Sequence, residues 1–76
     1  MNSVIIVGVC IALDDFSLTL RIENDKDLKM FFESKEDVQS IEIGVLTKVE
    51  GYLDIREFPF PVVIIKKVYQ ISQKVC

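Results

Sequence analysis

Residues 16–23, with the sequence FSLTLRIE, decide the fold class, because apolar and polar side chains alternate along them. The apolar set is Phe16, Leu18, Leu20 and Ile22. A period of two is typical of a strand with one face in a core and the other in water, so this set, Phe16 included, is expected inside. The polar residues 24–27 predict a turn, and residues 28–33 predict the second strand of a hairpin.

The rest of the chain predicts three more strands and one short helix. Residues 2–13 form an apolar strand that ends at the turn-forming pair Asp14-Asp15. Ser34 begins a short helix, and Gly44 ends it by supplying a positive φ. Residues 45–57 and 62–71 form the last strands, separated by prolines that cannot occupy a central ladder.

Five strands with one helix between the third and fourth predict an all-β OB-fold barrel, as a single domain over residues 1–76. An SH3-like barrel, which normally lacks that helix, and a small α+β sandwich are the alternatives.

The strand patterns also predict which side chains face the core. Both faces of the first strand are apolar: one carries Val4, Ile6, Gly8, Cys10 and Ala12, and the other carries Ile5, Val7, Val9, Ile11 and Leu13. A barrel has one interior, so the second set is expected to meet another chain or the curled edge of the barrel. In the fourth strand the residues expected inside are Val45, Thr47, Val49, Gly51, Leu53 and Ile55. Gly51 predicts a bulge or bend, and one of Phe31 and Phe32 is expected in the core.

Composition excludes several classes of protein. The chain has 76 residues, half of them hydrophobic, including ten valines, ten isoleucines and one alanine, which is strand chemistry and excludes disorder. The apolar runs fall short of the roughly 18 residues that a membrane helix needs. Histidine is absent, and Cys10 and Cys76 have no metal-ligand spacing. We therefore expect no enzyme activity, no cofactor and no metal, and the lack of a basic leader predicts a cytoplasmic protein.

Size and charge bear on partners. So small a core usually needs a disulfide, a metal or a second subunit, and oligomerisation is the option left. The net charge of −3 argues against a simple basic nucleic-acid binder. The charge is uneven, however: residues 1–38 carry 4 basic and 8 acidic side chains (−4), whereas residues 39–76 carry 5 and 4 (+1).

Two motifs resemble a known family. Residues 2–8, NSVIIVG, resemble the opening strand Asn-x-Val-x-Leu-x-Gly of bacterial single-stranded DNA-binding proteins. Residues 44–51, GVLTKVEG, resemble the Gly-x-x-x-x-Val-Glu-Gly of that family, with the seven-residue step between the glycines kept. The loops are shorter, tryptophan and the acidic tail are absent, and Tyr52 stands where the family commonly has Arg. The chain thus resembles a minimal, tail-less member or a primosomal replication protein relative.

That resemblance implies a homodimer or homotetramer that binds single-stranded DNA, and possibly RNA, without chemistry, with a possible replication protein partner. Single strands are held by stacking on aromatic rings and by cations along the phosphates. The candidate residues are Lys48, Tyr52, Arg56, Phe58, Phe60, Lys66 and Lys67. The alternative interpretations are a solvated strand face for the first three, packing against the barrel for the two phenylalanines, and an edge-strand guard against aggregation for the two lysines.

Two functions follow from these patterns. The first is a non-catalytic protein of replication, recombination or plasmid transfer that binds single strands. The second is an OB-fold adapter that binds a protein and has little nucleic-acid affinity.

Overall fold

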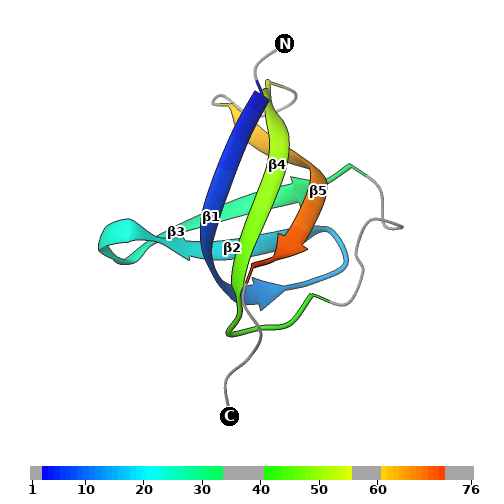
Figure 1. Cartoon of the computed structure of the whole chain (residues 1–76). Coiled ribbons are helices and arrows are strands. Elements are labelled where there is room, and N and C mark those ends of the chain that lie inside the picture. The colour runs from blue at the N-terminus through cyan, green and yellow to red at the C-terminus, as the bar shows by residue number, and fades with distance from the viewer. Residues whose placement is uncertain (1–2, 34–40, 56–60, 72–76) are drawn as a thin grey trace.

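The chain forms an all-β barrel in the computed structural model, which describes residues 3–33, 41–55 and 61–71 (Figure 1). The elements are β1 (Ser3–Leu13), β2 (Ser17–Ile22), the short 3-10 helix η1 (Glu23–Asp25), β3 (Lys26–Phe32), β4 (Leu46–Asp54) and β5 (Val62–Gln70). The five strands close in the order β1-β2-β3-β5-β4. The predicted fold class is therefore confirmed, and the strand order is consistent with an OB-fold.

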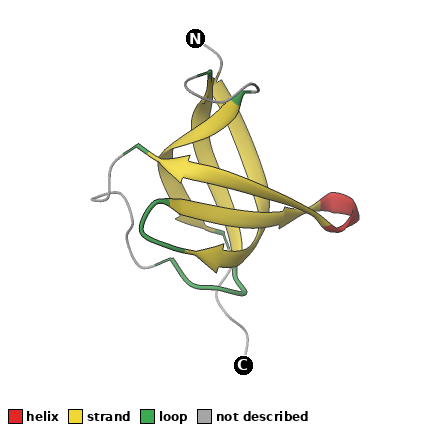
Figure 2. Ribbon diagram, turned by 180° about the vertical axis from the view of Figure 1, so that it is seen from behind, coloured by secondary structure: helices red, strands yellow, loops and turns green. Residues whose placement is uncertain are grey.

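The ladders are antiparallel with one exception. β3 and β5 run parallel and meet only at the pairs Phe31↔Ile64 and Phe32↔Ile65. β1 is shared between two sides of the barrel, because its first half pairs with β4 and its second half pairs with β2. Figure 2 shows the β2–β3 hairpin, with η1 in red at its tip, projecting from the body of the barrel.

The core is built from one face of each strand. Its fully buried members are Cys10, Leu18, Leu20, Met30, Val49 and Ile65, and Val63 joins them. Phe32 packs against this cluster and Phe31 is half-buried on the other face of β3, so the prediction that the pair divides is confirmed.

A β-bulge in β1 reverses part of the predicted facing pattern. The register of β1 against β2 shifts between Cys10 and Ala12. The extra residue exchanges the two faces of the strand beyond it. Leu13 therefore packs against the core and Ala12 is exposed, the opposite of what strict alternation predicts.

A second bulge explains why two lysines interrupt the last strand. Glu50 pairs with Lys67 and Gly51 pairs with Ile65, so Lys66 is the extra residue. Ile65 and Val68 both point to the core, and Lys66 and Lys67 are both exposed. The predicted irregularity at Gly51 is confirmed, although the additional residue lies in the partner strand.

Three residues expected in the core are exposed. Phe16 is 67% exposed because β2 begins after it, at Ser17, so Phe16 lies in the turn. Ile55 is 70% exposed because β4 ends at Asp54. Leu53 is 40% exposed although it lies within β4.

The predicted helix falls mostly on residues 34–40, which lie outside the described residues. Residues 41–44 are not helical; they lead into a turn in which Gly44 has φ +91° and its N–H donates to the Cys10 carbonyl at 2.7 Å. The expected positive φ at Gly44 is therefore confirmed. Within the part of the chain that the structure describes, no helix has the length and hydropathy needed to cross a membrane.

We predict that Gly51→Ala destabilises the protein by about 1–3 kcal/mol, the usual cost of overpacking. A Cβ at this position would overlap the backbone carbonyl oxygen of Ile64, which cannot rotate away as a side chain can. Urea unfolding measures the change. Ser3→Ala, on the exposed face of the neighbouring strand, is the control and is expected within about 0.5 kcal/mol of wild type. Equal stability of Gly51→Ala and wild type would contradict the close approach of β4 and β5.

Candidate functional site

Three of the seven predicted binding residues converge on the outer face of the barrel. Tyr52, Lys66 and Lys67 line a shallow pocket of about 290 Å³, together with Glu50, Gly51 and residues 3–5 of β1. The bulge in β5 causes this convergence, because without it one of the two lysines would point to the core. Arg56, Phe58 and Phe60 lie outside the described residues.

A glutamate that the sequence reasoning missed holds this group together. The Tyr52 hydroxyl donates to Glu33 Oε2 at 3.0 Å, and Lys66 Nζ donates to Glu33 Oε1 at 3.2 Å. Lys66 Nζ also lies 5.7 Å from the centre of the Tyr52 ring. Glu33 thus orients the ring and neutralises part of the Lys66 charge. The Lys66–Glu33 pair is solvent-exposed and therefore worth at most about 1 kcal/mol.

A second aromatic ring lies on the same outer face. Phe31 and Tyr52 both pair with Ile64, one from each side, so the three residues form a row across β3, β5 and β4. Neighbouring strands are about 4.8 Å apart, which places the two ring-bearing backbones roughly 10 Å apart. Ile64 is only 2% exposed although Val63 and Ile65 on either side of it belong to the core. The middle of the row is therefore apolar and covered.

Each ring of the row carries a lysine. Lys29 Nζ lies 5.8 Å from the centre of the Phe31 ring, as Lys66 does at Tyr52. Lys29 and Phe31 share one face of β3 because they are two residues apart, and Glu33 follows directly after the strand. The alternation that singled out the fourth strand would have found this second group too. We call Phe31, Tyr52, Lys29, Lys66 and Lys67 the aromatic–lysine face.

Lys48 belongs to a separate part of the surface. Its Nζ lies 5.8 Å from the centre of the Tyr69 ring and 3.9 Å from Glu50 Oε2. Lys48 precedes Tyr52 by four residues in a strand, a separation of about 13 Å. The structure therefore does not join Lys48 to Tyr52 in one contact group, and it links Lys48 to Tyr69, which the sequence reasoning had not selected.

The turn before β2 holds Phe16 opposite Phe32 at the end of β3. Phe16 is exposed, and its backbone carbonyl accepts from the N–H of Phe32 at 2.9 Å. Asp14 builds the turn: its carboxylate accepts from the backbone N–H of Phe16 at 2.8 Å, and from the N–H and hydroxyl of Ser17 at 2.7 and 3.0 Å. The predicted turn at Asp14 is thus confirmed.

Among the described residues, no three His, Cys, Asp or Glu side chains lie together where they could hold a metal ion. Burial raises the pKa of the Cys10 thiol, which disfavours the reactive thiolate. What the outer face offers instead is aromatic surface and lysine ammonium groups.

Comparison with known proteins adds no relative. No family model, no curated protein and no solved structure matches this chain significantly.

We predict that the Asp14 turn weakens in acid. The backbone N–H of Phe16 and the Ser17 hydroxyl hold the pKa of Asp14 below its ordinary value of about 4. A lowered pKa in the folded state contributes stability above the unfolded pKa, and this contribution is lost as the pH falls through the folded pKa. The difference in unfolding free energy between wild type and Asp14→Ala should therefore be constant above about pH 5 and narrow below about pH 4. Urea unfolding across pH measures it, and a difference that grows in acid would contradict the assignment.

Proposed function

We propose that this protein binds single-stranded DNA without catalysing a reaction, as a cytoplasmic homo-oligomer in replication, recombination or plasmid transfer. The observation that carries the proposal is the aromatic–lysine face, in which two rings flank Ile64 and each ring has a lysine ammonium within 6 Å. Any of the bases can stack on an aromatic ring, so stacking does not depend on nucleotide sequence. A cation beside the ring contacts the adjacent backbone phosphate. This face therefore supplies both contacts that sequence-independent binding requires.

Charge sets the strength of such binding. Lys29 and Lys67 have no carboxylate within ion-pair distance among the described residues, whereas Glu33 pairs with Lys66. Binding to single strands weakens as salt is added. For each phosphate that the protein neutralises, the logarithm of the binding constant falls by about 0.7 for every tenfold rise in salt concentration. With few cations in each subunit, we expect micromolar affinity at low salt and higher affinity when several subunits engage one strand.

An exposed apolar surface supports the oligomer. Ile5, Val7 and Val9 of β1 are exposed, at 61%, 45% and 38%, and Val9 pairs with the exposed Leu46 of β4. We call these four residues the β1 outer face. A monomer this small has little core to offset so much exposed aliphatic surface, and a second copy that packs on it would add burial.

The alternative function is an adapter that binds another protein through the same apolar residues. The net charge of −3 favours it, because overall repulsion opposes the approach of a polyanion. The two functions differ in one measurable property, since an adapter has no affinity for oligonucleotides at low salt.

We predict that a fluorescein-labelled oligo-dT shows increased anisotropy with micromolar protein at low salt, and that added salt reverses it. Tyr52→Ala and Phe31→Ala should each weaken binding by about 1–3 kcal/mol, the value of one base–aromatic stack. Glu33→Gln should strengthen binding, because it removes the carboxylate that competes with phosphate for Lys66.

Tyr69→Ala is the matched control, since Tyr69 is an exposed tyrosine with a lysine beside its ring that lies outside the aromatic–lysine face. Its loss of affinity should be smaller than that of Tyr52→Ala. Equal losses would contradict the placement of the site. No binding at tens of micromolar protein would contradict the DNA-binding function and leave the adapter.

We predict that light scattering finds a dimer or larger species, and that Val7→Asp dissociates it. A charge at Val7 cannot be buried against a second copy without a large desolvation cost. Lys26→Asp, on the exposed β2–β3 hairpin and away from β1, should leave the mass unchanged. A monodisperse wild-type monomer would contradict the assignment of the β1 outer face.

A further inference from the structure

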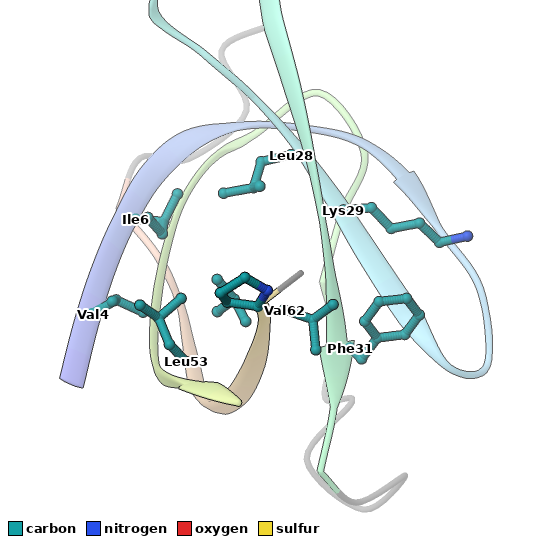
Figure 3. A pocket seen from close by; sticks show the side chains of 9 residues that line it. Val4, Ile6, Leu28, Lys29, Phe31, Leu53 and Val62 are labelled. Carbon is teal, nitrogen blue, oxygen red and sulfur yellow. The ribbon is translucent and has the colours of Figure 1, made fainter. Parts of the chain in front are cut away.

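An apolar cavity of about 600 Å³ opens at the end of the barrel where β1 and β5 begin (Figure 3). Val4, Ile6, Leu28 and Leu53 point into it, from β1, β3 and β4. Ligand pockets in proteins span about 300–1,000 Å³, so this volume suits a small molecule. The cavity adjoins the outer pocket around Tyr52, because Val4 lines both.

The strand pairing explains why the barrel is open here. The β1–β2 ladder stops at Val9↔Arg21, so the first half of β1 has β4 as its only strand neighbour among the described residues. The β3–β5 ladder does not begin until Phe31↔Ile64. The first halves of β1 and β3 therefore face each other across a gap that no described strand spans.

The lining side chains are left incompletely packed. Leu53 is 40% exposed although its neighbours on the same face of β4, Val49 and Gly51, are buried. Val4, Ile6 and Leu28 pack against the core yet remain half-buried. Water is a poor occupant of the cavity, because these aliphatic side chains offer it no hydrogen bonds. An aliphatic occupant would bury them all.

Lys29 lines the cavity from the outer side of β3. Lys29 and Phe31 stand on the opposite side of β3 from Leu28, and in Figure 3 the Lys29 ammonium points away from the cavity. No carboxylate of the described residues lies within ion-pair distance of Lys29 Nζ. The lysine stem is long and flexible, so its ammonium can meet an anion at the opening.

We propose that this cavity binds a medium-chain fatty acid, with the hydrocarbon chain among the aliphatic side chains and the carboxylate at Lys29. A peptide fits less well, because the described residues that point into the cavity offer no polar side chain to its backbone amides, whose burial without partners is costly. A fatty acid carries a single polar group, and Lys29 is the single charged residue among the described residues that line the cavity. The proposal does not depend on DNA binding.

The test is displacement of 11-(dansylamino)undecanoic acid by decanoate, followed by dansyl fluorescence. We expect the probe to brighten on binding and decanoate to displace it. Leu53→Trp, which fills the cavity, should weaken probe binding at least tenfold. Lys29→Gln should weaken decanoate about twofold to fivefold, as expected for one exposed ion pair, and leave decanol unchanged. Circular dichroism verifies that each variant is folded.

Ile43→Ser is the matched control, because Ile43 is an exposed aliphatic residue that lies outside the cavity. It should bind the probe as wild type does. Methyl NMR of the wild-type protein gives a readout without substitutions: decanoate should shift the signals of Val4, Ile6, Leu28 and Leu53. Failure of decanoate to displace the probe, shifts confined to Ile5, Val7 and Val9, or full binding by folded Leu53→Trp would each overturn the proposal.

Discussion

The close approach of β4 and β5 at Gly51 is the constraint on which the outer surface depends. The Ile64 carbonyl occupies the space that a side chain at position 51 would need, so the two backbones can meet there only at a glycine. The extra residue in β5 then turns both Lys66 and Lys67 outward while Ile65 and Val68 remain in the core. A barrel without this bulge would bury one of the two lysines. The pocket beside Tyr52 thus has its origin in a backbone contact.

The barrel has more aliphatic side chains than one interior holds, and the surplus lies in two places. Ile5, Val7 and Val9 lie outside on β1, where each alternates with a residue of the inner face. Leu53 lies at the open end of the barrel, where the strands have parted. Exposed apolar surface of this kind is unfavourable in water, so both places are candidates for contact with another molecule. The β1 outer face suits the flat surface of another protein molecule, and the cavity suits a hydrocarbon chain.

A glutamate reduces the positive charge of the aromatic–lysine face. Glu33 lies between Tyr52 and Lys66 and contacts both, so the ring is held in place at the expense of part of the positive charge. On β4, Glu50 lies 3.9 Å from the Lys48 ammonium and offsets part of its charge. A polyanion that binds here must replace these carboxylates, which is why salt and the loss of Glu33 are expected to act in opposite directions on affinity.

The sequence by itself determined the all-β class, the five strands, the turn at Asp14 and the positive φ of Gly44, because these follow from local alternation and turn chemistry. The alternation of apolar and polar residues gave wrong predictions where a strand begins later than its pattern or contains a bulge. Phe16 continues the pattern of β2 but lies before the strand begins, and the bulge in β1 exchanges Ala12 and Leu13. Only the tertiary structure brought Glu33 and Lys66, which are 33 residues apart, to one site. Such pairing depends on strand order and register, and no short stretch of sequence contains either.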